Sequence, residues 1–145
     1  MANVHKSKLS LRVSGESLVP TEITHLLGAS PTFSQARGDS IRVNDGTSVR
    51  IARFGMWLLS VNDRSPENLE GQLRELFEQL TDNLNVWRQI QKDYSADILC
   101  GLFMQGSNEG FAISTGAMRM IADRGLTIEF DMYGGDELSR TSEDR

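Results

Sequence analysis

Residues 65–94 read SPENLEGQLRELFEQLTDNLNVWRQIQKDY, and this stretch decides the fold. Its apolar side chains recur at steps of three and four residues, which places one apolar stripe along one side of a helix. They are Leu69, Leu73, Leu76, Phe77, Leu80, Leu84, Trp87 and Ile90. Ser65-Pro66-Glu67 predicts the helix start, with a hydroxyl cap, a proline in the first turn and an acid at the positive end of the helix dipole. Thr81-Asp82-Asn83 can cap a second start, so one long helix and two shorter helices with a bend both fit the pattern.

Strands are predicted on both sides of this helical stretch. Residues 8–14 and 126–133 alternate apolar and polar side chains, as strands with one buried and one solvated face do. Residues 98–104 (ILCGLFM) are apolar at both parities, which is typical of an inner strand covered on both faces. Residues 48–62 favour β structure, and Gly55 interrupts them either as a bulge or as the turn of a second hairpin.

Two short helices complete the pattern. Pro20 and Gly28 bound the first, and Ser114 and Gly125 bound the second. We therefore expect an α+β fold with one mainly antiparallel sheet of five or six strands and helices packed on one face. The order of elements resembles a ferredoxin-like plan with an extra helix and strand at the end. A single domain over residues 8–135 would lie between a disordered N-terminal tail, residues 1–7, and a disordered acidic C-terminal tail, residues 136–145.

Composition excludes several classes of protein. The formal net charge of the 145 residues is -5 at pH 7, whereas binding nucleic acid relies on a basic face. No apolar run has the length of a membrane span, and the first residues lack the apolar segment of a signal peptide. The lone cysteine, Cys100, lies in an apolar run, which fits a reducing cytoplasm. We expect a cytoplasmic protein with no nucleic-acid or membrane partner.

Motifs of the common enzyme and cofactor classes are absent. The sequence has no phosphate-binding Gly-x-x-x-x-Gly-Lys, no Gly-x-Gly-x-x-Gly, no Cys-x-x-Cys and no His-Glu-x-x-His. The two histidines are His5, near the N-terminus, and His25, on the polar side of a short helix. We therefore predict no catalytic residue, no metal site and no cofactor.

The solvated face of the sheet supplies the first candidate site. If the first and last strands lie near each other, Arg12 shares a surface with Glu129, Asp131 and Tyr133. The two carboxylates would lie roughly 7 Å apart along one strand face. Such a pair can do acid–base work or hold a cation. The alternative is a charged, solvated face on which Arg12 offsets the acids across strands.

A group of arginines supplies the second candidate. Arg37, Arg42, Arg50 and Arg53 lie close together in an otherwise acidic chain, which indicates an anionic ligand or an acidic partner surface. The alternative is protection of a strand edge by charged side chains. Trp57 follows in the next strand; it is a core residue unless the uncovered face is partly apolar, in which case it joins the binding residues.

Four segments carry a resemblance to a known family. They are residues 10–15 (SLRVSG), 20–28 (PTEITHLLG) with Pro31-Thr32 after them, 57–60 (WLLS) and 128–133 (IEFDMY). Together they resemble the small bacterial family labelled "domain of unknown function 4279". The resemblance implies one intact bacterial domain and implies no activity.

The function that we expect is a non-enzymatic binding or protein-interaction module of regulatory or immunity type. The alternative is a small-ligand binder or hydrolase-like enzyme that uses the polar sheet face. Because residues 98–104 are apolar at both parities, helices on one side would leave Leu99 or Phe103 uncovered on the other. A second subunit is a common cover for such a strip, so a homodimer is predicted.

Overall fold

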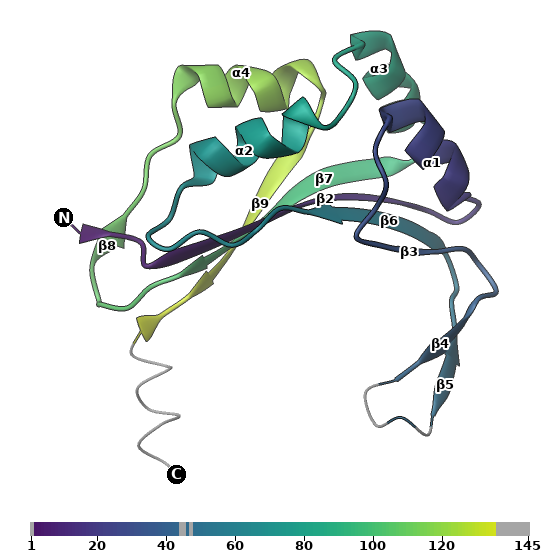
Figure 1. Ribbon diagram of the computed structural model, residues 1–145, viewed down its shortest axis with the longest axis horizontal. Coiled ribbons are helices and arrows are strands. Elements are labelled where there is room, and N and C mark those ends of the chain that lie inside the picture. The colour runs from purple at the N-terminus through teal and green to yellow at the C-terminus, as the bar shows by residue number, and fades with distance from the viewer. Residues whose placement is uncertain (1, 44–45, 47, 136–145) are drawn as a thin grey trace.

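The computed structural model describes residues 2–43, 46 and 48–135. Its main sheet has five strands, in the spatial order β3 (Phe33–Gln35), β6 (Gly55–Ser60), β2 (Lys6–Gly15), β7 (Ser95–Phe103) and β9 (Thr127–Tyr133). The helices are α1 (Pro20–Leu27), α2 (Leu69–Glu78), α3 (Leu84–Asp93) and α4 (Thr115–Asp123). Two small sheets pair β4 (Ser40–Arg42) with β5 (Val49–Ile51), and β1 (Ala2–Asn3) with β8 (Glu109–Gly110). The fold is α+β, with all four of these helices on one face of the main sheet (Figure 1).

The main sheet is mixed, which corrects the prediction of a mainly antiparallel sheet. β2 lies at its centre and pairs antiparallel with both β6 and β7, and β3 pairs antiparallel with β6. β6 therefore lies between the parallel strands β2 and β3, a split β-α-β arrangement. β9 pairs parallel with β7, because α4 returns the chain to the start of β7 before β9 begins.

Residues 65–94 form two helices, and the first begins later than predicted. The side chain of Asn68 caps α2 by accepting from the backbone N–H of Gly71, and Asn83 caps α3 in the same way. Ser65 is thus not the cap, because the asparagine beside the first turn fills that position. The predicted stripe is correct in position, since Leu73, Leu76, Trp87 and Ile90 are fully buried, among others.

Residues 2–7 are part of the fold, which corrects the prediction that this part of the chain belongs to a disordered tail. Val4 is fully buried, and Ser7 is fully buried on β2. The Ser7 hydroxyl donates to the side-chain oxygen of Gln72, Oε1, at 2.6 Å. The side-chain nitrogen of Gln72, Nε2, donates to the backbone carbonyl of Ser7 at 3.0 Å. This pairing satisfies the buried polar groups and ties β2 to α2. The predicted C-terminal tail, residues 136–145, lies outside the described residues.

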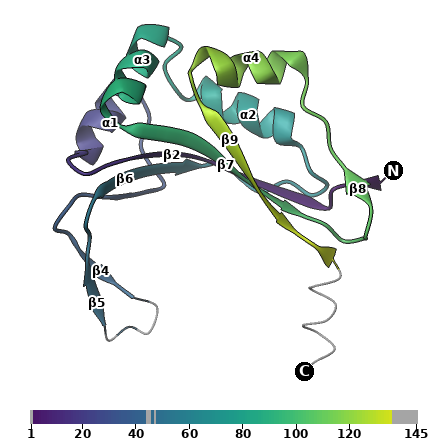
Figure 2. The ribbon, with the colours of Figure 1, turned by 180° about the vertical axis from the view of Figure 1, so that it is seen from behind.

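Residues 48–62 belong to two sheets, not to one strand. β4 and β5 form a hairpin that extends from the main sheet on the side opposite the helices (Figures 1 and 2). Val49 and Ile51 on this hairpin are 60% and 56% exposed. Gly55 is the first residue of β6 and is neither a bulge nor a hairpin turn. A Cβ atom there would lie 2.3 Å from the carbonyl oxygen of Leu18, so the backbone itself occupies the space of a side chain.

The core fills the space between the sheet and the helices. Trp57 is fully buried there, and its indole N–H donates to the Thr24 hydroxyl of α1 at 3.0 Å. Trp57 therefore does not join a surface site, because its side chain points toward the helices. In the ranges that the structure describes, no helix is both long enough and apolar enough to cross a membrane.

Cys100 is expected to be an inert thiol. It lies on β7 with 1% of its surface exposed, and burial raises its pKa to about 12. Because the thiolate is the reactive form, the native protein should react with a thiol-labelling reagent at pH 8 far more slowly than the unfolded chain does. Timed labelling with and without denaturant, followed by mass spectrometry, measures this difference. Equal rates in the two states would contradict the buried position.

Candidate functional site

The face of the main sheet that points away from the helices is the first candidate, and we call it the open face. Its side chains alternate with buried ones along β2, β6 and β7, and the register places alternate residues of β9 beside those of β7. They include Lys6, Lys8, Ser10, Arg12, Leu58, Asp97, Leu99, Phe103, Glu129, Asp131 and Tyr133. In both ribbon views no described helix lies over this face (Figures 1 and 2).

Arg12 is held by an acid that the sequence analysis missed. Its guanidinium donates to both carboxylate oxygens of Asp97, at 3.1 and 2.7 Å. Glu129 lies further away, with 3.7 Å between Arg12 Nη2 and Glu129 Oε2. Hydrogen bonding of the Arg12 guanidinium to the Asp97 carboxylate is the largest cause of the raised pKa of Arg12. Strand alternation could have predicted this position, because Asp97 precedes Leu99 by two residues and therefore lies on the same face of the strand.

The strands that carry Arg12 and the predicted acids, β2 and β9, are not neighbours, because β7 lies between them. The predicted group of four still lies on one face, but Arg12 is shared between Asp97 and Glu129, and Asp131 pairs with Tyr133. The Tyr133 hydroxyl donates to Asp131 at 2.8 Å, and this bond raises the pKa of Tyr133. The side chain of Glu129 is 54% exposed. Perturbed carboxylate pairs need burial, so this arrangement does not favour acid–base catalysis.

One end of the open face is aromatic. The rings of Phe103 and Tyr133 stack with 4.6 Å between their centroids and an interplanar angle of 7°. The Lys6 ammonium lies 4.5 Å from the centroid of Phe103, and that of Lys8 lies 5.9 Å away. These are distances at which a cation is attracted to a ring face. Aromatic side chains such as these are enriched at protein-contact surfaces.

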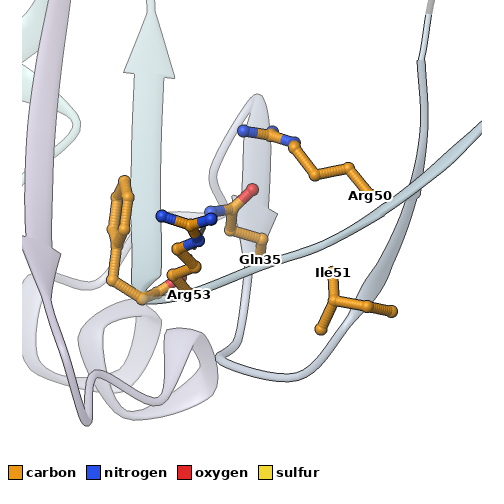
Figure 3. A pocket seen from close by; sticks show the side chains of 5 residues that line it. Gln35, Arg50, Ile51 and Arg53 are labelled. Carbon is orange, nitrogen blue, oxygen red and sulfur yellow. Dashed lines mark hydrogen bonds between the residues drawn. The ribbon is translucent and has the colours of Figure 1, made fainter.

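The second candidate is a pocket at the base of the β4–β5 hairpin, which we call the hairpin pocket. It has a volume of about 480 Å³ and is lined by Gln35, Arg50, Ile51, Arg53 and Phe54. The guanidinium groups of Arg50 and Arg53 turn toward the Gln35 amide from two directions (Figure 3). Gln35 is 5% exposed, and its amide donates to the Phe54 carbonyl oxygen at 3.1 Å.

The predicted arginine group is divided in the structure. Arg50 and Arg53 line the hairpin pocket, whereas Arg37 lies outside that lining and pairs with Glu16 at 3.0 Å. Sequence reasoning missed Gln35, because a polar residue in a short edge strand carries no local signal of burial. Over residues 2–43, 46 and 48–135, no group of three or more His, Cys, Asp or Glu side chains is placed to hold a metal ion.

Comparison with known proteins gives one match. A family model described as "Domain of unknown function (DUF4279)" matches residues 5–135. No curated protein and no solved structure matches the chain. The resemblance inferred from the four sequence segments is confirmed.

Proposed function

Since the chain belongs to the DUF4279 family, whose description names no activity, we propose a function from its surfaces: a non-enzymatic protein-interaction module whose contact surface is the open face. The observation that carries the proposal is a sheet face that no described helix covers, on which half-buried apolar side chains lie beside the Arg12–Asp97 ion pair. We further propose that the protein acts in the bacterial cytoplasm, in a regulatory or immunity-type role.

Apolar side chains on the open face support this function. Leu58, Leu99 and Phe103 are half-buried there, and Phe33 of β3, which pairs with Leu58, is 43% exposed. The register places Phe33 and Leu58 on one side of β2, and Leu99 and Phe103 on the other. Apolar side chains exposed on a globular domain in this way support a contact site. The Arg12–Asp97 pair also suits an interface, because a charge that keeps its own partner can be covered at a lower cost than a lone one.

The charges favour a second copy of the chain as the partner. On the open face, β2 carries Lys6, Lys8 and Arg12. The two strands that follow it in the sheet, β7 and β9, carry acids, including Asp131 of β9. β7 separates Lys8 from Asp131 in one row of the sheet. A two-fold interface needs a surface that complements itself. If two copies met face to face about a two-fold axis parallel to β7, Lys8 of one copy would lie over the partner's Asp131.

Self-association tests this proposal. We expect the wild-type chain to sediment as a dimer at micromolar concentration and the Phe103→Glu variant as a folded monomer, because a carboxylate would be buried beside the contact. Met118→Glu is the matched control: it makes the same kind of change at a 50%-exposed residue of α4, on the helix-covered side. A wild-type monomer, or a dimer that Met118→Glu breaks as readily, would contradict the proposal.

A charge exchange sharpens this test. Lys8→Asp and Asp131→Lys should each weaken the dimer, and the double variant should restore much of the loss. The alternative function, a small-ligand binder or hydrolase-like enzyme using Arg12, Glu129, Asp131 and Tyr133, is less well supported. These side chains are paired with one another or with Asp97, and they lie at a solvated surface.

A further inference from the structure

We propose that the hairpin pocket binds a small organic anion, with a carboxylate or phosphate group held between Arg50 and Arg53. The residues that line this pocket differ from those named for the open face, and the proposal does not depend on the dimer. The argument rests on the charge of the two arginines, the buried amide beside them, and the size and apolar part of the pocket.

Neither arginine of the hairpin pocket has a carboxylate counterpart among the described residues. Among the described residues, Arg12, Arg37, Arg64 and Arg74 each pair with a carboxylate. Neither Arg50 nor Arg53 forms an ion pair within the same ranges, although the chain as a whole is acidic. Two guanidinium groups directed at one space repel each other, and an anion between them removes that repulsion. Each can also donate two parallel hydrogen bonds to a carboxylate or a phosphate.

Edge protection does not account for both of them. Arg50 lies on β5, which pairs with β4, so it belongs to a strand of a small exposed sheet. Arg53 lies between β5 and β6 and belongs to no strand. A charge outside any strand cannot protect a strand edge. The anion-binding alternative is therefore the one that explains Arg53.

Gln35 gives the pocket a fixed polar wall. Its side chain is nearly fully buried, and its amide is oriented by the 3.1 Å hydrogen bond to the Phe54 carbonyl. A primary amide carries a second N–H and a carbonyl oxygen, which can bond a ligand. A polar group fixed in a pocket before binding contributes to specificity, since little entropy is lost when the ligand arrives.

The size and the apolar lining indicate an organic anion and not a bare ion. A volume of about 480 Å³ exceeds what inorganic phosphate needs and is within the usual range of small-molecule sites. Ile51 and Phe54 also line the pocket and are 56% and 40% exposed. They offer a contact for an apolar or planar part of the ligand, in the same pocket as the arginines that hold its charge.

Calorimetric titration of the full chain tests the site. The probes are phenyl phosphate and benzoate, with inorganic phosphate as the comparison that lacks the apolar part. We expect one organic probe to bind at least about tenfold more tightly than inorganic phosphate, and its affinity to fall as salt is added. Tighter binding of phenyl phosphate assigns a phosphate ligand, and tighter binding of benzoate a carboxylate.

Variants of the arginines complete the test. Arg50→Gln and Arg53→Gln should each lower the affinity of the bound probe by about tenfold or more, because each removes charge-assisted hydrogen bonds. Arg42→Gln is the control, since Arg42 is exposed on the same hairpin but does not line the pocket. The proposal is overturned if neither organic probe binds at about 1 mM, or if the Arg42 and Arg53 variants lose affinity equally. The dimer is measured separately by sedimentation, so either proposal can fail alone.

Discussion

Replacing Trp87 by alanine is expected to lower the free energy of unfolding by about 3–5 kcal/mol. Trp87 is fully buried on α3, and its indole N–H donates to the Thr81 backbone carbonyl at 2.9 Å. Its ring meets the Phe77 ring of α2 edge-on, with 6.3 Å between centroids. The substitution therefore leaves a large cavity between two helices and an unpaired carbonyl group.

Arg124 increases the expected loss. Its guanidinium carbon lies 4.3 Å from the centroid of Phe77 and 6.0 Å from that of Trp87. Its Nε atom is buried without a hydrogen-bond partner in the described structure, and burial lowers the pKa of Arg124. The rings are thus part of what stabilises a poorly solvated charge.

Denaturant unfolding followed by circular dichroism measures the Trp87 effect. Gln89→Ala, at an exposed position of the same helix, is the control and should change the unfolding free energy by no more than about 0.5 kcal/mol. The loss of unfolding free energy for Trp87→Phe should lie between those of Trp87→Ala and Gln89→Ala, because phenylalanine keeps an aromatic ring but lacks the indole N–H. Similar losses for the Trp87 and Gln89 alanine variants would mean that α3 is rotated from its described orientation.

The second large effect is expected for Gly55→Ala, which should lower the free energy of unfolding by about 3 kcal/mol or more. The added Cβ atom would lie 2.3 Å from the carbonyl oxygen of Leu18, and a backbone atom cannot move aside as a flexible side chain can. The strand start and the segment before α1 would have to separate.

The same substitution in α4 provides the control for Gly55. At Gly116 the nearest atom to an added Cβ is the Ser114 hydroxyl oxygen, at 3.8 Å. Gly116→Ala should therefore cause no loss of stability, since alanine is the better helix former. Thermal unfolding of both variants compares them directly. A Gly55→Ala protein as stable as the wild type would show that β6 does not pack against Leu18 as described.

Sequence periodicity predicted the features that depend on local pattern. The stripe that includes Leu73 and Leu76 was predictable because burial on one helix side requires that spacing. The start of α2 was not, because several polar residues precede it and only the folded loop shows that Asn68 caps it. The burial of Ser7 could not be predicted either, since its partner Gln72 lies on a helix far along the sequence.

The candidate sites divide in the same way. Strand alternation correctly placed Arg12 and Glu129 on one face, but the main partner of Arg12 is Asp97, just before the apolar run that dominated the prediction. The arginine-rich composition of residues 37–53 was visible in the sequence. The hairpin pocket was not, because it forms where Gln35 of β3 meets the segment after β5. Side chains from separate elements give no signal until the chain is folded.

The central position of β2 has a consequence for how the protein is made. β2 is synthesised near the start of the chain, yet Leu9 pairs with Cys100 and Ser14 with Ser95 on β7. A nascent chain can pair one edge of β2 with β6, but the other edge must stay unpaired until β7 is synthesised, when most of the polypeptide exists. Such pairing over a long sequence separation slows folding and exposes the growing chain to aggregation. Chaperone dependence during synthesis should thus be greater than for a helical protein of equal length.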